Sequence, residues 1–276
     1  MHNLNKKYYL DKSLDRKSLA YLDKYLNEHP DISSDKINEY IKKIEKGIPI
    51  QYIVGDVNFY GNIIKVNENV LIPRYCTEEL VEKTLSYIDK FFITNKLNIL
   101  DLCTGSGCIA ISLKKELPSS NIVASDISVN SLKLAKENAT INLTDITFLE
   151  SDLFKKILGK YHVIISNPPY LDECEEIESQ VRKYEPSIAL FAPNNGLYYY
   201  EEILKNVSLY LEDKYLIAFE IGYNQKDALI KLKDKYLKGA TIISQKDLEG
   251  FERFIFITRI ISYYWKQKNK KWVIRI

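Results

Sequence analysis

The sequence has few of the residues that bind metals or form disulfides. Its 276 residues include 3 histidines and 4 cysteines, and no two cysteines have the C-x-x-C spacing of metal and redox sites. No apolar run approaches the ~20 residues that a membrane-spanning helix needs, and residues 1–12 lack the apolar core and cleavage site of a signal peptide. We therefore expect a cytoplasmic protein, in a reducing compartment, that binds neither a metal nor a membrane.

An excess of charge of one sign is missing as well. The 39 Lys and Arg residues against 37 Asp and Glu residues leave a formal net charge of +2, which does not indicate non-specific binding to nucleic acid. Hydrophobic residues make up 46% of the chain and charged residues 28%, which is ordinary for a folded globular protein. The length suits one full-sized domain with a smaller one.

The first part of the chain has the apolar spacing of helices and then of strands. Apolar residues recur at helical intervals before and after the capping candidates Ser33 and Ser34, at Leu19, Leu22, Leu26, Ile37, Ile41 and Ile44. This pattern predicts a small helical domain over residues 1–56. Residues 59–66 and 70–72, with Asn67-Glu68-Asn69 between them, resemble the two strands of a hairpin. We therefore predict a β-hairpin linker over residues 57–75.

From about Lys96 onward, expected strands and helices alternate. Strands are predicted at residues 98–102, 122–125, near 148, near 164, and at 215–220, 240–244 and 254–258, with helices to 117, through 139, and at 198–211 and 227–237. Such alternation predicts an α/β domain with a mostly parallel, Rossmann-like sheet over residues 76–260, whose last strands form an antiparallel edge. We expect residues 261–276 to form a solvated tail, to which we assign no role.

A glycine-rich segment from Asp101 to Ala110 stands at a predicted strand-to-helix turn. Gly105 and Gly107 allow positive φ or close backbone approach to a ligand there. Asp126 lies 19 residues after Gly107, at the end of the next strand, where a carboxylate can accept hydrogen bonds from two ribose hydroxyls. These features indicate an adenosine-containing ligand. Because Gly105-x-Gly107-x-x-Ala110 also satisfies the dinucleotide fingerprint, the loop leaves both NAD and S-adenosylmethionine open.

The tetrapeptide Asn167-Pro168-Pro169-Tyr170 follows an apolar strand, at the sheet edge where α/β proteins bind ligands. Two prolines make a stiff turn without backbone donors, so its carbonyls are free to accept hydrogen bonds. The side-chain oxygen of Asn167 and the carbonyl of Pro168 can accept both hydrogens of a planar nitrogen and turn its lone pair toward a methyl donor. Tyr170 is expected to cover the acceptor. Amides and the exocyclic amine of adenine both remain possible acceptors.

Many motifs, in order, resemble the HemK/PrmC family of release-factor glutamine methyltransferases. They span Pro49 to Phe256 and comprise Pro49-Ile50-Gln51-Tyr52-Ile53-x-Gly55, Phe59-Tyr60-Gly61, Val70-Leu71-Ile72-Pro73-Arg74, Asp101 to Ala110, Ser166 to Tyr170, Tyr184-Glu185-Pro186, Ala189-Leu190, Gly196-Leu197, Glu220-Ile221-Gly222 with Gln225, and Lys246-Asp247-Leu248-x-Gly250 with Arg253. The resemblance implies a class I methyltransferase fold with an N-terminal helical domain that docks the substrate.

The resemblance also implies an activity and a set of site residues. The family transfers a methyl group from S-adenosylmethionine to the glutamine of the Gly-Gly-Gln motif in class I peptide chain release factors. Residue by residue, it implies that the cofactor is contacted by Cys103, Thr104, Gly105, Ser106, Gly107, Asp126, Leu153 and Asn167. It implies that the glutamine amide is held by Asn167, Pro168, Pro169 and Tyr170, of which Asn167, Pro168 and Tyr170 are expected to be catalytic. We expect a monomer whose partner is the release factor.

The chain departs from the family pattern at three places. Cys103 stands where the family usually has glycine, so we expect this position to keep a negative φ. Leu153 stands where an aromatic residue is frequent, which replaces ring stacking on adenine by aliphatic contact. The segment Tyr75-Cys76-Thr77-Glu78 replaces a Pro-Glu-Thr-Glu run. These departures bear mainly on the affinity for the cofactor.

Three other functions use part of the same sequence evidence. An adenine-N6 methyltransferase could use the same tetrapeptide, although the near-neutral charge and the lack of a target-recognition domain count against it. An NAD-dependent oxidoreductase would explain the glycine loop but not residues 167–170. A cofactor-binding module without catalysis would also leave the tetrapeptide without a purpose.

Overall fold

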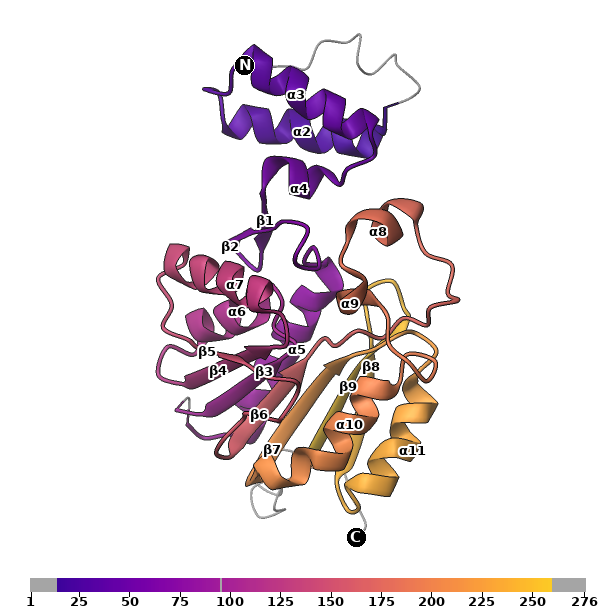
Figure 1. Cartoon of the computed structure of the whole chain (residues 1–276). Coiled ribbons are helices and arrows are strands. Elements are labelled where there is room, and N and C mark those ends of the chain that lie inside the picture. The colour runs from indigo at the N-terminus through magenta and orange to yellow at the C-terminus, as the bar shows by residue number, and fades with distance from the viewer. Residues whose placement is uncertain (1–13, 95, 260–276) are drawn as a thin grey trace.

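The computed structural model describes residues 14–94 and 96–259, so the predicted tail lies outside the described residues. A seven-stranded sheet is covered by helices, and a hairpin and a group of three helices lie at one end of it (Figure 1). The sheet contains β3 (Asn98–Leu102), β4 (Asn121–Asp126), β5 (Thr147–Glu150), β6 (Tyr161–Ser166), β7 (Leu211–Glu220), β8 (Thr241–Lys246) and β9 (Glu252–Arg259). The helices around it are α5 (Tyr75–Phe91), α6 (Cys108–Glu116), α7 (Val129–Ile141), α8 (Ser179–Tyr184), α9 (Ser187–Leu190), α10 (Tyr198–Asn206), the 3-10 turn η1 (Val207–Tyr210) and α11 (Lys226–Tyr236). No helix in these ranges is long and apolar enough to cross a membrane.

The strands are arranged in the order β5-β4-β3-β6-β7-β9-β8. The strands from β5 to β7 in this order are parallel, whereas β9 is antiparallel to both of its neighbours. The expected mostly parallel sheet with an antiparallel edge is therefore confirmed. The direction in which strands are added reverses between β3 and β6, and open α/β sheets bind ligands beyond the carboxyl ends of the strands at such a point.

Both faces of the sheet are buried. In β3, Ile99 packs into the core cluster beneath α5 and α6, and the next residue, Leu100, packs into the cluster beneath α10 and α11. Because successive side chains of a strand point to opposite faces, a strand buried on both faces has an unbroken apolar sequence. The rigid sheet then holds the loops at the ends of its strands in fixed positions.

Helix α5 is not among the elements that the sequence pattern predicts. Its N-cap position is Arg74, whose side chain makes no capping hydrogen bond, so the usual start signal is missing. Its buried face includes Leu80, Thr84 and Ile88, at intervals of four residues. Packing of this face against the sheet, rather than a capping signal, defines the helix.

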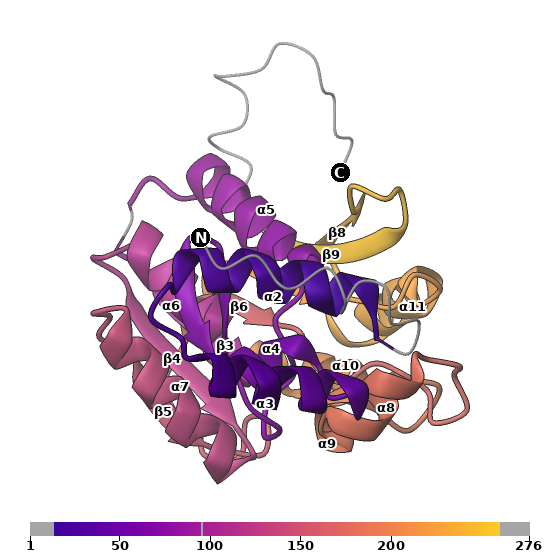
Figure 2. The same ribbon diagram turned by 90° about the horizontal axis from the view of Figure 1, so that it is seen from above.

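Three helices precede the sheet. They are α2 (Arg16–Glu28), α3 (Ser34–Glu45) and α4 (Ile50–Val54), and seen from above α2 and α3 lie over the end of the sheet (Figure 2). Asp15 caps α2 and Ser33 caps α3 through side-chain hydrogen bonds to backbone amides. The leucines and isoleucines that predicted these helices form a core of their own. The division of the chain into domains at residue 56 stays a prediction.

The hairpin differs from the predicted one. It consists of β1 (Asp56–Phe59) and β2 (Asn62–Lys65), joined by Tyr60 and Gly61 at φ angles of 49° and 76°. Two central residues with positive φ make the tight turn that matches strand twist. The predicted strand at residues 70–72 is wrong, because Asn67 folds its side chain onto the amide of Asn69 and the chain then runs on as a loop.

Candidate active site

A cavity of about 940 Å³, including its part open to solvent, lies at the carboxyl ends of β3, β4, β5 and β6. This is where the strand order reverses, as expected for a ligand site in such a sheet. Its wall comes from segments that are distant in the sequence: residues 69–71 with 73 and 77, 103–106 with 108 and 109, 125–128 with 131, 151–153, 167 and 169, 188 and 189, and 199.

The glycine-rich loop forms one side of the cavity and is held by hydrogen bonds to the next strand. The amide of Thr104 donates to the carbonyl of Ser125 at 2.9 Å, and the Thr104 hydroxyl donates to Asp101 at 2.6 Å. Cys103 has a φ of 60°, so the expectation of a negative φ at this position is wrong. That conformation costs a residue with a Cβ about 1–2 kcal/mol, and the surrounding hydrogen bonds offset this cost.

Asp126 lies beside this loop with both carboxylate oxygens anchored. One oxygen accepts from the amide of Gly105 and the other from the amide of Ser128, each at 2.9 Å. Burial raises the pKa of Asp126, while these two amides act in the opposite direction. Since each carboxylate oxygen has a second lone pair, the anchored side chain can still accept hydrogen bonds from a ligand.

Asp101 lies deeper, at the end of β3, and is fully buried. Burial raises the pKa of this carboxyl to about 7, although the hydrogen bond from Thr104 acts to lower it. Its oxygen Oδ1 has no hydrogen-bond partner among the described residues. The buried hydroxyl of Ser125, in the cavity wall, is likewise without a partner there. The unmatched hydroxyl of Ser125 is consistent with a polar ligand in the cavity.

Most of the residues expected to contact the cofactor come together in the cavity wall. They are Cys103, Thr104, Gly105, Ser106, Asp126, Leu153 and Asn167. Gly107 is not part of the wall. It starts α6 with a φ of 82°, and a Cβ there would lie 3.1 Å from that of Ala135, so it serves the turn and the packing of α6 on α7. The roles of these residues toward the cofactor stay predictions.

Several wall residues were not singled out from the sequence. Ile127 and Ser128 follow Asp126 at the end of β4, and Asp152 follows β5. Their signal is their place after a strand at the carboxyl edge of a parallel sheet, the same signal that identified Asp126. Thr77 enters the wall from α5, and because that helix is not predicted, neither is this residue.

Only part of the tetrapeptide lines the cavity, and the rest packs into the protein interior. Asn167 and Pro169 line the cavity, whereas Pro168 and Tyr170 lie outside its lining. The ring of Tyr170 packs against the core, and its hydroxyl donates to Glu220 at 3.3 Å. Its hydrogen bond to Glu220 turns the ring inward, and its expected role over the acceptor stays a prediction.

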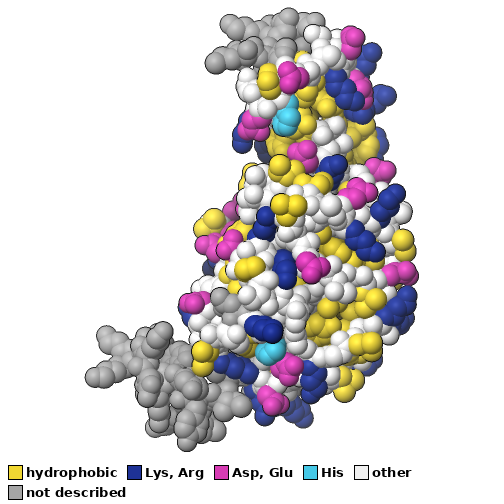
Figure 3. All heavy atoms as spheres, turned by 90° about the vertical axis from the view of Figure 1, so that its left-hand side faces the viewer, with side chains coloured by type: hydrophobic (Ala, Val, Ile, Leu, Met, Phe, Trp, Pro, Cys, Tyr) yellow, Lys and Arg dark blue, Asp and Glu magenta, His cyan; other side chains and the backbone are white. Residues whose placement is uncertain are grey.

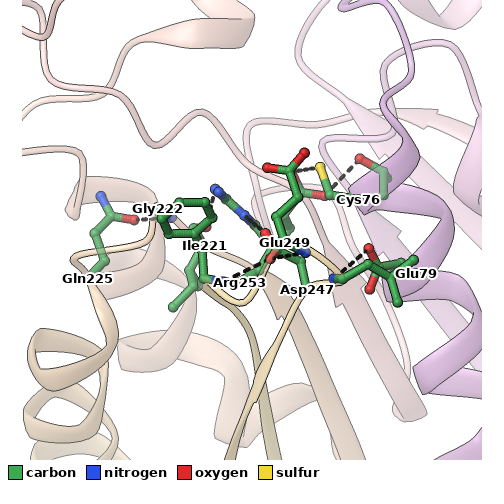
Figure 4. Close-up of polar contacts among 12 residues, drawn as sticks. Cys76, Glu79, Ile221, Gly222, Gln225, Asp247, Glu249 and Arg253 are labelled. Atoms are coloured by element: carbon green, nitrogen blue, oxygen red, sulfur yellow. Dashed lines mark hydrogen bonds and ion pairs between the residues drawn. The ribbon is translucent and has the colours of Figure 1, made fainter.

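The backbone after the prolines is clamped from one side. Gln225 accepts from the amide of Gly222 at 2.9 Å and donates to the carbonyl of Tyr170 at 2.8 Å. Figure 4 shows Gln225 bonded to Gly222, next to the Arg253 side chain. A Cβ on Gly196 would lie 1.9 Å from the Tyr170 carbonyl oxygen, so only glycine fits there. The turn that carries Asn167 is thus fixed by packing as well as by its prolines.

An ion pair between a partly exposed arginine and a buried glutamate lies next to the cavity wall residue Pro73. The Glu185 side chain is 2% exposed, pairs with Arg74 at 2.5 Å, and accepts from the amide of Ile72 at 3.1 Å. Residues that follow the hairpin are thereby joined to the loop between β6 and α10. In the same loop, Gln180 and Tyr184 donate to the carbonyls of Gly47 and Lys46, at the end of the N-terminal helices.

Known proteins with similar sequences share one description. The family model for the methyltransferase small domain matches residues 75–183. The release factor glutamine methyltransferase of Lactococcus lactis is 38% identical over 259 residues, which cover 93% of this chain and 90% of that protein. The chain belongs to the release factor glutamine methyltransferase family. The family member of Streptococcus pneumoniae is 37% identical, with 87% of each chain covered.

The resemblance predicted from the motifs is thus confirmed, and with it an enzyme of the methyltransferase class. Among solved structures, a methyltransferase from Pyrococcus furiosus superposes with a TM-score of 0.54 at 17% identity, covering 73% of this chain and 90% of that one. At this identity the match concerns the fold alone, and it confirms the expected Rossmann-like methyltransferase fold.

Proposed function

We propose that this protein transfers a methyl group from S-adenosylmethionine to the side-chain amide nitrogen, N5, of the glutamine in the Gly-Gly-Gln motif of class I peptide chain release factors, and so tunes translation termination. The observation that carries the proposal is the position of Asn167, whose side chain borders the same cavity as the glycine loop and Asp126. The names of the relatives, release factor glutamine methyltransferases, support the choice of acceptor.

The charges of the cavity favour a cationic ligand. Asp126 and Asp152 are in its wall, and no lysine or arginine is among the described residues that line it. A sulfonium cation gains from this environment. The NAD-dependent oxidoreductase is disfavoured because it leaves residues 167–170 unexplained and because the relatives are methyltransferases.

The surface charges weaken the second alternative, methylation of adenine in nucleic acid. On the side of the molecule shown in Figure 3, basic and acidic side chains intermingle over the part that the structure describes. Proteins that grip a nucleic-acid backbone present clustered basic residues instead. Binding of a protein loop that carries the acceptor glutamine does not require a surface of clustered basic residues.

The residues of the site act by positioning the acceptor. When bound, S-adenosylmethionine supplies an electrophilic methyl group. An amide nitrogen is a weak nucleophile because its lone pair is delocalised, and alignment contributes most where reactivity is low. We infer that the Asn167 side-chain oxygen and the Pro168 carbonyl accept the two N–H hydrogens and so orient the lone pair. The nitrogen becomes acidic once methylated and then loses a proton to solvent, so a strong base is not required.

A labelling experiment tests this function directly. Release factor and labelled S-adenosylmethionine are incubated with the enzyme, and peptide mass spectrometry locates the label. We expect it on the Gly-Gly-Gln glutamine and not on a release factor in which that glutamine is replaced by alanine. No label on the release factor, with label on bare DNA, would favour the adenine alternative. Tight NAD binding in calorimetry without S-adenosylmethionine binding would favour the oxidoreductase.

Replacement of Asn167 tests the residue on which the proposal depends. Asn167→Ala removes one acceptor of the amide hydrogens, and loss of one such group typically lowers kcat about 100- to 1000-fold. We expect the affinity for S-adenosylmethionine in calorimetry to change far less, which also separates an enzyme from a binding module. An unchanged kcat on release factor would contradict the assignment.

A further inference from the structure

A chain of hydrogen bonds connects Asn167 to a buried carboxylate that the proposed chemistry does not use. The side-chain Nδ2 of Asn167 donates to the Thr77 hydroxyl oxygen at 3.2 Å, and this hydroxyl donates to Glu220 at 2.7 Å. Thr77 is in the first turn of α5, and Glu220 is the last residue of β7. Glu220 is 1% exposed and Thr77 is 3% exposed, so water does not compete for these contacts.

The order of donors and acceptors in this chain follows from the Thr77 hydroxyl, which has a single hydrogen. The hydroxyl donates this hydrogen to Glu220. The hydroxyl oxygen is then left as an acceptor, and Asn167 has to present its NH₂ group to it. The other edge of the amide, Oδ1, accepts no hydrogen bond from the described residues, and Asn167 lines the cavity.

Other groups donate hydrogen bonds to Glu220 as well. The Tyr170 hydroxyl and the Cys76 thiol both donate to its Oε1, at 3.3 and 3.5 Å. Burial raises the pKa of Glu220, while Thr77, the nearby Arg253 and these two donors act to lower it. Arg253 is itself held by Asp247 at 3.1 Å, and Figure 4 shows this pair on the side of the site that carries Cys76. Burial and Glu220 raise the pKa of Cys76 to about 12, so it stays a thiol donor.

We propose that Thr77 and Glu220 are positioning residues for methyl transfer, which turn the Asn167 amide so that Oδ1, and not Nδ2, faces the acceptor nitrogen. This inference rests on the proposed function, in which Oδ1 accepts an N–H of the glutamine amide. With the amide reversed, Nδ2 would point its hydrogens at the acceptor and lose the hydrogen bond that orients the lone pair. Thr77 of α5 and Glu220 of β7 thus determine the orientation of the side-chain amide of Asn167, on the loop after β6.

Thr77→Val and Thr77→Ser form the matched pair that tests this role. Valine keeps the shape of threonine and removes the hydroxyl, whereas serine keeps the hydroxyl. We expect Thr77→Val to lower kcat on release factor about 10- to 100-fold, because misplacement of a reacting group has costs of this size. The Kd of S-adenosylmethionine in calorimetry is expected to stay within about twofold of wild type. Thr77→Ser should restore most of the lost rate.

Glu220→Gln adds a second, independent variant. Its amide can donate to Thr77 as well as accept, so it no longer imposes one direction on the chain, and kcat should fall with the cofactor Kd retained. Because both variants break the same chain, the double variant is expected to be little slower than Thr77→Val alone. If valine prevents folding, Thr77→Ala takes its place in the cycle.

The outcomes separate this inference from the proposed function. Absence of label from wild-type reactions would overturn the function itself. Labelling by wild type with an equally fast Thr77→Val would overturn only the positioning role. A Thr77→Ser variant as slow as Thr77→Val, or a loss confined to the cofactor Kd, would also overturn it. Rescue by serine with an unchanged Kd and a non-additive double variant would support it.

Discussion

Single residues hold the acceptor turn in place, and Gly196 shows how narrow the fit is. Its φ of 77° resembles the 82° of Gly239, but a Cβ on Gly196 would lie 1.9 Å from the Tyr170 carbonyl oxygen, whereas one on Gly239 would meet nothing within 4 Å. The two glycines therefore separate the cost of positive φ from the cost of a clash.

This pair leads to a stability prediction. Gly239→Ala should lower the free energy of unfolding by about 1–2 kcal/mol, the cost of the left-handed region. Gly196→Ala should lower it by at least about 2 kcal/mol more, because the Tyr170 carbonyl must move. Urea unfolding of both variants measures the difference. Equal losses would mean that the backbone near Gly196 relaxes freely.

The raised pKa of Asp101 leads to a prediction about how the unfolding free energy depends on pH. Its pKa is raised by burial from 3.8 to about 7 in the folded protein. A carboxyl group whose pKa is raised in the folded protein stabilises the fold fully at pH values below its unfolded pKa of 3.8. This contribution is lost as the pH rises through the folded pKa of about 7. Between pH 4 and 8, wild type should therefore lose up to about 4 kcal/mol more unfolding free energy than Asp101→Asn.

The pH series is measured by urea unfolding of the protein without ligand. Asp213→Asn, at an exposed carboxyl in β7, is the control for the removal of one acid. Parallel curves for wild type and Asp101→Asn would contradict the assigned pKa. If the plot of unfolding free energy against pH becomes flatter in Asp101→Asn but not in Asp213→Asn, the assigned pKa is supported.

At the scale of elements, the hairpin is joined to the cofactor loop through one side chain of α7. Asn138 accepts from the amide of Lys65 at 2.8 Å and donates to the carbonyls of Lys65 and Ser106, at 3.0 and 2.9 Å. It is fully buried. A single amide thus satisfies backbone groups of β2 and of the loop that lines the cavity.

Removal of this amide should weaken both the fold and the cofactor site. Asn138→Ala leaves buried backbone groups without their partner, which costs about 3 kcal/mol of unfolding free energy. We also expect weaker binding of S-adenosylmethionine, because Ser106 loses its support. Asn130→Ala, at an exposed residue of the same helix with one hydrogen bond of 3.4 Å, should change stability by less than about 0.5 kcal/mol. Similar losses in both variants, measured by urea unfolding and calorimetry, would refute this role.

At the scale of the whole molecule, hydrogen bonds join the region of the N-terminal helices to the sheet domain. Tyr184 donates to the Lys46 carbonyl at 2.6 Å, Gln180 to the Gly47 carbonyl at 2.9 Å, and Tyr52 to the Val70 carbonyl at 2.6 Å. If these helices dock the release factor, as the family resemblance implies, such contacts align a bound protein with the cavity.

Loss of one contact should then affect the protein substrate alone. We expect Tyr184→Phe to raise KM for release factor about three- to tenfold, the equivalent of one hydrogen bond, with KM for S-adenosylmethionine unchanged. Tyr236→Phe is the matched control, since its hydroxyl binds Glu201 between α11 and α10. Steady-state kinetics with each substrate varied in turn measures both constants. Equal KM values for release factor in the two variants would argue against a docking role.

The local sequence determined the parts of this protein whose signals are local. Periodic leucines predicted α2 and periodic isoleucines predicted α3, and alternation of strands and helices predicted the sheet. The glycine loop, Asp126 and Asn167 were found because each lies at the carboxyl end of a strand. A short segment carries its own preference for helix, strand or turn, so these elements follow from neighbouring residues. Even so, Tyr60 and Gly61 took the hairpin turn that Asn67-Glu68-Asn69 was expected to form.

Only the tertiary structure decided which side chains meet. Asn167 contacts Thr77 across 90 residues of sequence, and Thr77 contacts Glu220 across 143. No periodic pattern encodes such pairs, because they depend on how α5 packs against β7 and on the order of the strands. The positive φ of Cys103 and the inward turn of Tyr170 have the same origin, since the surrounding hydrogen bonds override the local preference of each residue. The tetrapeptide predicted the chemistry from the sequence, and the fold determined which edge of its asparagine binds Thr77.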